Sequence, residues 1–398
     1  MSNKVYIAGM GARSAIGNTV EENLAALRSG ETGLGPIRYL DTVHRNAFPA
    51  GEVKHSNAEL AALCGWQGTN SRTAMLGYLA AKEALEDAGI PLDDLRCGLI
   101  NATSVAGMDL TEEFFPAFLN NHHSGRLRQV VQHECGAISR IMSGALGIHD
   151  FVTTISTACS SAANAIMLGA RMIRAGRLDL VVAGGTDALS RFTLNGFNTL
   201  MILDHELCQP FDQQRRGLNL GEGAGYLVLI SEALKTKLGR SPEVTVSGYA
   251  NANDAHHQTA SSPEGAGSFI AMKAALEMSG LSVSDIDYIN LHGTGTQNND
   301  ASESTAIRRI FGDALPRMSS TKGFTGHTLA ACGGIEAVYA ISGILGQCLF
   351  PGLRIVDPVI PEAGVMVNQY ETGQSVQHVL SNSFGFGGNC STLIFSRS

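Results

Sequence analysis

The sequence lacks the features that mark two large classes of protein. No run of basic residues occurs in the 398-residue chain, in which 28 lysines and arginines stand against 36 acidic residues for a net charge of −8. Contact with a phosphate backbone needs clustered positive charge, so nucleic acid is not an expected partner. No window approaches the roughly 18 uninterrupted apolar residues of a membrane span, so a membrane is not expected either.

Targeting and metal-binding patterns are also missing. Residues 1–18 contain "VYIAGMGARSAIG", which is too short and too often broken by glycine for the core of a signal peptide, so we expect a cytoplasmic protein. The eight cysteines form no CxxC pair and no His/Cys cluster at zinc spacing. A chain of this length needs no disulfides, so most of the thiols are expected to be buried and inert.

An internal repeat is present. Residues 80–95, "AAKEALEDAGIPLDDL", align without gaps with residues 271–286, "AMKAALEMSGLSVSDI", at an offset of 191. Each copy predicts a helix that ends at a glycine, Gly89 or Gly280, and is followed by a short strand. The chain is therefore predicted to consist of two duplicated halves.

Strand candidates alternate with helices along both halves. They are "KVYIAG", "CGLINAT", "DFVTTIS", "LDLVVAGG", "GYLVLIS", "EVTVSGYA", "DYINLHG", "HVLSNSF" and "STLIFS". This alternation predicts α/β layers with buried, mostly parallel strands. The polar stretch "SEALKTKLGRSPE" at 231–243 is the predicted seam, which gives an N-terminal half at 1–242 and a C-terminal half at 243–398.

Cys159 stands where a β-prone run meets small residues and helix formers, in "TISTACSSAANAI". The residues after it stay apolar or small until Arg171, so we expect a buried helix whose N-terminus opens inside the protein. There the helix dipole and unpaired backbone N–H groups would lower the pKa of Cys159 and could receive an oxyanion. The alternative is that Cys159 is one more small buried hydrophobic residue.

Two of the twelve histidines stand at the ends of predicted elements. His292, in "INLHGTGT", follows a buried strand, and His327, in "SSTKGFTGHTLAACGG", precedes an apolar helix. Catalytic groups collect at such positions in α/β proteins. For each, a satisfied core or capping histidine is the alternative.

Five ordered motifs carry a resemblance that covers essentially the full chain. They are "TACSSA" around Cys159, "PFDQQRRGLNLGEGAGYLVL" at 210–229, "HGTGT" at 292–296, "SSTKGFTGH" at 319–327 and "NSFGFGGN" at 382–389. Together they resemble the elongating, type II β-ketoacyl-acyl-carrier-protein synthases of the thiolase superfamily. The resemblance implies an α/β fold, a thiolase-like five-layer αβαβα sandwich of two similar halves.

The same resemblance implies a condensing acyltransferase of fatty-acid or polyketide chain elongation. Cys159 would take an acyl group from a carrier-protein thioester, while His292 and His327 would promote loss of CO2 from a malonyl thioester. The resulting carbanion would attack the acyl-cysteine and give a 3-oxoacyl chain longer by two carbons. Lys322 matches the family's active-site lysine and Glu336 its acidic partner, and this buried pair would hold the His327 turn in place.

Further positions match the family's substrate path. The backbone N–H groups of Cys159 and Phe386 would form the oxyanion hole. The pantetheine arm would be held by the hydroxyls of Thr259, Thr294 and Thr296, for which strand and turn propensity is the alternative. The gating loop would comprise Phe384, Gly385, Phe386, Gly387 and Gly388. No metal and no cofactor is expected to be bound, because the substrates carry phosphopantetheine on an acyl carrier protein.

The resemblance also implies partners. Because the family dimerises through the sheet edge near the nucleophile, "DFVTTIS" is expected to face a second subunit, either identical or a related ketosynthase or chain-length factor. Acidic carrier proteins need a local basic patch. The candidates are Arg126, Arg128, Arg171, Arg174 and Arg177. The last three are equally explained as charges that complement a helix dipole.

Some positions depart from the family pattern. Gln297 replaces the usual proline after "HGTxT", and the last loop reads "GFGGNC" where "GFGGTN" is usual. Thr111, in the segment that matches the acyl tunnel, stands near a position where a bulkier apolar residue is common. The first two changes count against ordinary fatty-acid specificity, and Thr111 indicates a longer or stiffer acyl chain. The sequence is also similar to ketosynthases of bacterial aryl polyene pathways, which pair with a chain-length factor that lacks the cysteine.

Other functions fit these motifs less well. A coenzyme A dependent thiolase would use a second cysteine near the C-terminus, such as Cys390, but the thiolase pattern around it is absent. Initiating ketosynthases use Cys, His and Asn, and the "TGH" context of His327 argues against them. A non-catalytic partner subunit resembling a chain-length factor would lack the nucleophile, and nothing in the motifs supports a cysteine protease.

Overall fold

The computed structural model describes residues 4–239 and 241–398. Residues 1–3, at the start of the N-terminal stretch, and Arg240, within the predicted seam, lie outside the described part.

The main strands form two groups of five. The first group, in spatial order, is β3 (Phe151–Ile155), β2 (Cys97–Ala102), β4 (Leu180–Asp187), β5 (Gly223–Ser231) and β1 (Val5–Arg13). The second is β6 (Val244–Asn253), β12 (Asn389–Arg397), β11 (His378–Phe384), β7 (Tyr288–Asn290) and β8 (Arg317–Ser319). A pairing of Tyr6 with Thr245 joins the two groups. All nine strand candidates of the sequence therefore lie in these sheets.

The two groups repeat one topology. In chain order, the second strand of each group pairs in parallel with the third strand and with the fourth, which follows the middle-layer helix. These pairs are β2 with β3 and β4 in the first group, and β7 with β8 and β11 in the second. The remaining pairings, β4–β5–β1 and β11–β12–β6, are antiparallel. The prediction of mostly parallel strands therefore holds only in part, because four pairings within the groups are parallel and four are antiparallel. The reason is that the chain returns from β4 to β5, and from β11 to β12, without a helical crossover through another layer.

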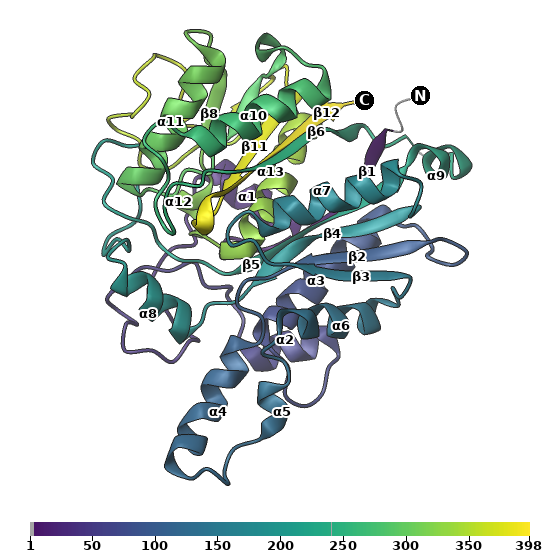
Figure 1. Cartoon of the computed structure of the whole chain (residues 1–398), viewed down its shortest axis with the longest axis vertical. Helices are drawn as coiled ribbons and strands as arrows, with labels where there is room; N and C mark the ends of the chain where they lie inside the picture. The colour runs from purple at the N-terminus through teal and green to yellow at the C-terminus, as the bar shows by residue number, and fades with distance from the viewer. Residues whose placement is uncertain (1–3, 240) are drawn as a thin grey trace.

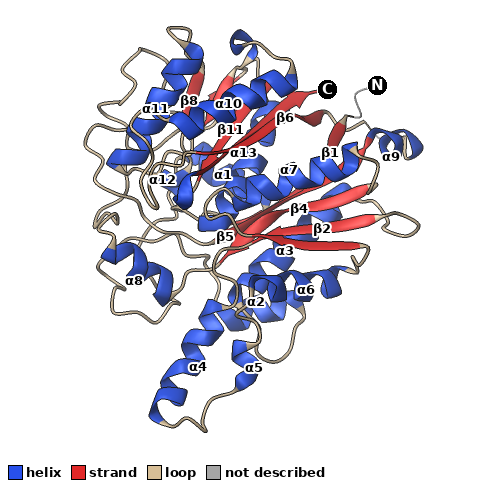
Figure 2. Cartoon of the chain, viewed as in Figure 1, coloured by secondary structure: helices blue, strands red, loops and turns tan. Residues whose placement is uncertain are grey.

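Helices cover both faces of each group and give the five-layer αβαβα sandwich that was predicted (Figures 1 and 2). One outer layer contains α3 (Arg72–Ala88) and α6 (Cys135–Leu146), and the other contains α10 (Ala266–Ser279) and α11 (Gln297–Phe311). Between the two groups of strands lie α7 (Ser161–Arg174) and α13 (Cys332–Gly346), which contact strands of both groups and each other. The middle layer is thus the place where the two halves meet.

The internal repeat corresponds to equivalent elements. Residues 80–95 include the end of α3, and residues 271–286 include the end of α10. Both helices end at the predicted glycines, since Gly89 and Gly280 adopt left-handed conformations with φ of 54° and 72°. Strands β2 and β7 follow them, as expected. The duplication is confirmed, whereas the exact boundary at residue 242 stays a prediction.

The remaining elements complete the layers and carry the loops. They are α1 (Val20–Ser29), α2 (Asn57–Cys64), α4 (Met108–Asn120), α5 (Leu127–Val130), α8 (Arg191–Thr199), α9 (Glu232–Lys237), α12 (Lys322–Thr325), the short 3-10 helices η1 (Val283–Asp285), η2 (Leu329–Ala331) and η3 (Phe386–Gly388), and the two-residue strands β9 (Cys348–Leu349) and β10 (Glu371–Thr372). Helices α4 and α5 form an arm that projects away from the layers (Figure 1).

One helical run in the described chain is long and apolar enough to cross a membrane by composition. It spans Leu329–Gly346, with a mean hydropathy of 1.5, and 89% of it is buried inside the protein. This burial identifies η2 and α13 as the core of the middle layer, where they pack against α7, β5 and β11. The run is explained by packing between two sheets.

Candidate active site

Cys159 lies in a tight turn between β3 and α7. Ala158, just before it, has a φ of 51°, a left-handed conformation that is uncommon outside glycine. Two hydroxyls close the turn, because Ser160 Oγ donates to the carbonyl of Thr157 at 2.7 Å and Ser161 Oγ donates to that of Ala158 at 2.5 Å. The turn places the thiol directly before a buried helix, as the sequence predicted.

His327 occupies the corresponding place in the second half. It follows β8 and precedes α13, as Cys159 follows β3 and precedes α7. Its backbone N–H donates to the carbonyl of Asn219 at 2.8 Å, and its carbonyl accepts from the N–H of Gly221 at 2.9 Å. The duplication therefore brings the nucleophile candidate and one histidine together from equivalent loops at the start of the two middle helices.

His292 follows β7, and a buried carboxylate fixes its backbone. The two oxygens of Glu303, on α11, accept from the N–H groups of His292 and Gly293, each at 2.9 Å. Burial raises the pKa of Glu303 to about 7, although these N–H groups and the Asn382 amide lower it. Glu303 stands where the family pattern expects it after "HGTxT", but it was not predicted as a site residue.

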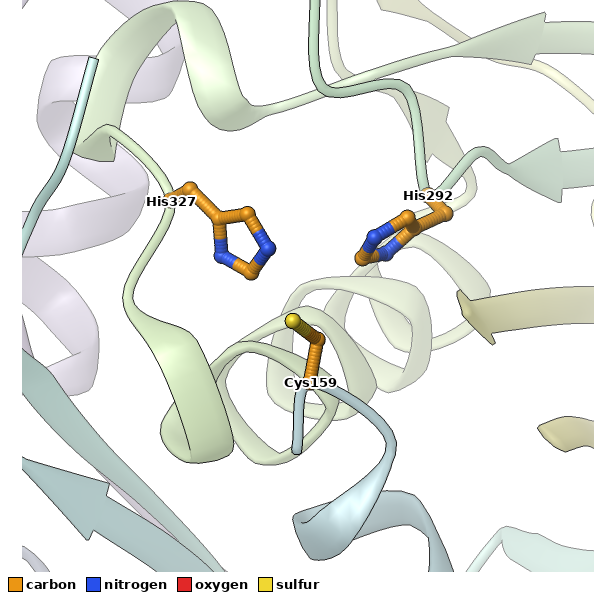
Figure 3. A group of neighbouring side chains, drawn as sticks. All are labelled: Cys159, His292 and His327. Atoms are coloured by element: carbon orange, nitrogen blue, oxygen red, sulfur yellow. The ribbon is translucent and has the colours of Figure 1, made fainter. Parts of the chain in front are cut away.

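Cys159, His292 and His327 meet at one point (Figure 3). The sulfur of Cys159 and one ring nitrogen of each histidine lie within 4.8 Å of one another. The two imidazole rings are 5.3 Å apart between centroids and nearly perpendicular. All three residues are buried, with exposed fractions of 6% for Cys159 and 2% for each histidine.

Burial keeps both histidines neutral, and the groups that face their Nδ1 atoms determine which ring nitrogen carries the proton. The N–H of Leu329 donates to Nδ1 of His327 at 3.1 Å, and the ammonium of Lys322 lies 3.4 Å from Nδ1 of His292. Burial lowers the pKa of both rings well below the ordinary value, and the Lys322 charge lowers it further. Since each Nδ1 accepts, the proton of each ring is on Nε2.

This arrangement bears on metal binding. A histidine that ligates a metal normally donates its other N–H to an acceptor, such as a carboxylate or carbonyl. Here Nδ1 of each ring faces a donor instead, so the protonated Nε2 is a hydrogen-bond donor. The side chains of Cys159, His292 and His327 therefore act as a thiol beside two neutral hydrogen-bond donors rather than as three metal ligands.

Lys322 and Glu336 form the predicted buried pair, with Nζ and Oε1 2.5 Å apart. Burial disfavours both charges and raises the pKa of Glu336 to about 7, but the two groups stabilise each other, and the pKa of Lys322 is raised. The pair was expected to hold the His327 turn. Its hydrogen bonds instead reach His292, because the lysine bridges Glu336 and the His292 ring, whereas the His327 turn is held by backbone groups.

The pKa of Cys159 differs from the prediction. Burial raises it to about 11, although the Lys322 charge and the N–H groups of Phe386 and Cys159 lower it. The helix N-terminus was expected to lower this pKa. Complete burial outweighs the favourable partners, because a thiolate loses more hydration there than the amides and the ammonium restore.

The two amides predicted as an oxyanion hole both face the sulfur. The N–H groups of Phe386 and Cys159 favour the charged form of the thiol and so lower its pKa. The loop comes this close because residue 385 is glycine: a Cβ there would lie 3.0 Å from the nitrogen of Cys159 and 3.1 Å from the carbonyl oxygen of Thr157. The Phe386 ring stacks on Phe197 of α8, with centroids 5.6 Å apart and planes 19° apart.

A cavity of about 330 Å³ opens onto the buried group. Ten of the predicted site residues line it: Cys159, Thr259, His292, Thr294, Thr296, His327, Phe384, Gly385, Phe386 and Gly388. Lys322 and Glu336 lie behind His292, outside the lining, and Gly387 is also outside it. Cys390, the second cysteine weighed for a thiolase, lines the cavity, but its sulfur lies 3.7 Å from the Ser268 hydroxyl and outside the group of three.

The three threonines differ in their contacts. Thr294 Oγ1 lies 2.9 Å from Thr296 Oγ1, so these two hydroxyls form a pair on the cavity wall. Thr296 also caps α11 by accepting from the N–H of Asn299. A purely structural role, the alternative given for the threonines, therefore explains part of its presence. Thr259 is exposed, and its N–H donates to Nδ1 of His257 at 3.1 Å.

The arginines considered for carrier-protein docking lie in two different parts of the structure. Arg126 and Arg128 are exposed on the arm, at the start of α5. Arg171 and Arg174 lie in the last turn of α7, about 20 Å along that helix from the end that opens at Cys159. Arg174 donates to the carbonyl of Val246 and lies over the ring of Tyr249, which is a packing role between middle helix and sheet.

Comparison with known proteins identifies the family. The family model described as "Beta-ketoacyl synthase, N-terminal domain" matches residues 2–234, and that described as "Beta-ketoacyl synthase, C-terminal domain" matches residues 244–355. The chain is 32% identical to the 3-oxoacyl-[acyl-carrier-protein] synthase 2 of Staphylococcus aureus (strain N315), over 100% of this chain and 99% of the relative.

Solved structures agree. "The ishigamide ketosynthase/chain length factor" superposes with a TM-score of 0.93 at 30% identity and covers 100% of both chains. The ketosynthase (ApeO) in complex with its chain length factor (ApeC) from Xenorhabdus doucetiae gives a TM-score of 0.85 at 31% identity, over 100% of this chain and 98% of that one. With these matches along its length, the chain belongs to the β-ketoacyl synthase family.

Proposed function

We propose that this protein is a 3-oxoacyl-acyl-carrier-protein synthase, which joins an acyl group held on Cys159 to the two carbons that a malonyl thioester keeps after losing CO2. The observation that carries the proposal is the meeting of one thiol with two neutral imidazoles whose protons are on Nε2. A thiol accepts an acyl group, and two donors can stabilise an enolate without a metal.

Acyl transfer uses the thiol and the two amides. The Cys159 thiolate attacks the thioester carbonyl of the donor, and the N–H groups of Cys159 and Phe386 stabilise the oxyanion that develops there. The carrier thiol leaves with a proton, and the acyl group stays on the sulfur. Because the pKa of Cys159 is about 11, the thiolate is a minor species near neutral pH, and acylation depends on how much of it forms.

Decarboxylation uses the two histidines. The carbonyl oxygen of the malonyl thioester accepts from Nε2–H of His292 and of His327 as the bond to the carboxylate breaks and CO2 leaves. The enolate carbon then attacks the acyl-cysteine carbonyl, the Cys159 sulfur departs, and a 3-oxoacyl thioester longer by two carbons results. Lys322 is the positioning residue for His292, because its ammonium fixes which ring nitrogen carries the proton.

The rest of the cavity fits a thioester on a long arm. The hydroxyls of Thr294 and Thr296 lie on the cavity wall, and Thr259 is at its exposed side, where a pantetheine arm would pass. Phe386, stacked on Phe197, is the proposed gate of the acyl pocket. No metal or further cofactor takes part in these steps. The substrates would come on an acyl carrier protein, with Arg126 and Arg128 as its proposed docking cations.

We also propose that the protein works as a dimer in the cytoplasm. Strand β3 stands at the edge of the first group, and each of its five residues is only half-buried. The arm exposes a set of large apolar side chains: Phe115, Leu119, Leu127 and Val131. Such an edge and such a patch are what a partner subunit covers. The partner is a second copy or, as in the structures named above, a chain length factor; an aryl polyene or other polyketide product stays a prediction.

Two of the alternatives lose their support. A non-catalytic chain-length-factor-like role does not explain an acylable cysteine with both histidines and an oxyanion hole around it. A thiolase would need its second cysteine beside the first, and Cys390 stands apart from the group of three.

A condensation assay tests the proposal. The protein is mixed with an acyl carrier-protein thioester and malonyl carrier protein, and both CO2 and the carrier-bound product are measured. The proposal predicts one CO2 for each 3-oxoacyl product, with neither formed by His292→Ala or His327→Ala. CO2 release without any condensed product from the wild-type protein would overturn it.

A further inference from the structure

The cavity has a single permanent positive charge among its described lining residues, and this charge is at the outer end. The lining includes Arg216 and no other arginine or lysine. At the inner end Cys159 is 6% exposed, whereas the side chain of Arg216 is 58% exposed. A ligand whose reactive end reaches the sulfur therefore passes Arg216 where it leaves the protein.

A buried carboxylate orients this arginine. Nη2 of Arg216 lies 3.0 Å from Oδ1 of Asp204, whose side chain is only 2% exposed. The same Oδ1 accepts from the N–H of Glu206 at 2.9 Å, and the N–H of Asp204 donates to the carbonyl of Leu218 at 2.9 Å. Asp204 is thus fixed by backbone contacts, and it holds one edge of the guanidinium in place.

The other donors of Arg216 are left for a second anion. A guanidinium has five N–H donors, and Asp204 is the polar partner that the described structure gives to this one. Asp254, the carboxylate of the cavity lining, does not compete, because its oxygens accept from the backbone and hydroxyl of Ser262 and from Gly267.

The neighbouring residue fixes Arg216 close to the threonine pair. Arg215 is buried, and its guanidinium donates to the carbonyls of Thr296 and Gln297 at 3.2 Å and 3.0 Å. The segment that carries Arg216 is therefore held against the start of α11. The rim cation stands next to the wall along which a pantetheine arm would lie.

We propose that Arg216 binds the phosphate of a phosphopantetheine group whose acyl end lies at Cys159, and that it selects donors carrying this phosphate over donors that lack it. The inference rests on the proposed function and adds a specificity residue to it. The chemistry recognised is a phosphate ester at the outer end of the arm. An acyl carrier protein and free coenzyme A both present this group.

The test compares two small donors that differ only in the phosphate, acyl-pantetheine and acyl-4′-phosphopantetheine. The rate of Cys159 acylation by each is followed by intact mass, and the quantity of interest is the ratio of the two rates. Because a hydrogen-bonded charge pair is worth somewhat more than a neutral bond, we expect the wild-type protein to favour the phosphorylated donor on the order of tenfold. Arg216→Gln should bring the ratio close to one, and Arg216→Lys should keep part of it.

The controls separate this inference from its premise. Arg140→Gln removes another exposed arginine that is ion-paired to a carboxylate, on α6 and outside the cavity lining, and should leave the ratio unchanged. If the wild-type protein acylates equally well with both donors, or if Arg216→Gln keeps the ratio, the inference is wrong and the proposed function stands. If neither these donors nor an acyl carrier-protein thioester acylates Cys159, both fail.

Two further donors identify the source of the phosphate. The rate of Cys159 acylation by an acyl carrier-protein thioester and by acyl-coenzyme A is measured for both the wild-type protein and Arg216→Gln. A loss on the order of tenfold with the carrier-protein donor assigns Arg216 to the carrier's phosphodiester. A loss confined to the coenzyme A donor retains the phosphate site but assigns it to free coenzyme A.

Discussion

The ammonium of Lys322 lies 3.4 Å from Nδ1 of His292 and bridges that ring to the buried Glu336 carboxylate. The relationship fixes the proton of His292 on Nε2 without a carboxylate touching the ring. A histidine in contact with a carboxylate would be drawn toward the charged form, whereas one beside an ammonium stays neutral. A lysine between the two keeps His292 a neutral donor.

The first prediction concerns this lysine. Lys322→Met should slow CO2 loss from malonyl carrier protein by about 100-fold, because the ring proton of His292 is no longer fixed. It should also lower the free energy of unfolding by about 3–5 kcal/mol, because the Glu336 carboxylate is left buried without its partner. Lys322→Met combined with Glu336→Met should regain stability in urea unfolding but not activity. Recovery of both would assign the pair a purely structural role.

The second prediction concerns pH. The pKa values of His292 and His327 are lowered well below 6.5, so both rings stay neutral as the pH falls through 6.5 and become charged only at lower pH. The Cys159→Ala variant isolates the malonyl step from acyl transfer. Its CO2 release, corrected for carrier stability, should be flat from about pH 8 to below 6.5. A half-loss of rate near pH 6.5 would contradict the account of two pre-set neutral donors.

The third prediction concerns the thiol. With a pKa of about 11, the thiolate fraction of Cys159 should rise about tenfold for each pH unit through pH 9. Alkylation by iodoacetamide, read at the Cys159 peptide by mass spectrometry, should follow this slope. A plateau reached below pH 8 would instead support the thiolate that the helix N-terminus alone predicts.

The fourth prediction concerns the proposed gate. Phe197→Ala removes the ring on which Phe386 stacks, an interaction worth about 0.5–1.5 kcal/mol. Labelling of Cys159 by a bulky maleimide should become faster by about two- to tenfold, since the loop opens more often. Phe192→Ala is the matched control, because this phenylalanine is on the same helix but is 63% exposed. Equal rates in both variants would rule out the stack as a latch.

The fifth prediction concerns assembly. Leu119 and Leu127 are 67% and 75% exposed on the arm, where a second subunit is proposed to pack. Leu119→Glu with Leu127→Glu should lower the mass measured by light scattering from that of a dimer to that of a monomer. Val356→Glu changes another apolar residue, 85% exposed in the second half, and should have no effect. An unchanged mass in the arm variant would place the interface elsewhere.

Much of the fold followed from local patterns. The strand candidates and the repeat are properties of short stretches, and each was found in the structure where the sequence put it. The pairing directions were not predictable, because β4 and β5 are separated by a long connection whose path no short stretch encodes. Strand β8 was missed because its three residues, "RMS", are too few to show a period.

The site also has features that the sequence could predict and features that it could not. Cys159, His292 and His327 could be selected because each stands at the end of an element, and the family resemblance supplied their partners. The pKa of Cys159 could not be predicted, because it depends on how deeply other segments bury the thiol. The roles of Glu303 and Arg216 could not be predicted, because they lie in contacts with residues that fold beside them, the His292 backbone and Asp204.

The central claim is that Cys159 carries the acyl group through condensation, and intact-protein mass spectrometry tests it most directly. The protein and its Cys159→Ala variant are mixed with a panel of acyl carrier-protein thioesters, and malonyl carrier protein is then added. The account predicts an acyl adduct on the wild-type protein alone, which disappears on addition of malonyl carrier protein as an extended product forms. An adduct of equal size on Cys159→Ala, or one that malonyl carrier protein leaves in place, would contradict it.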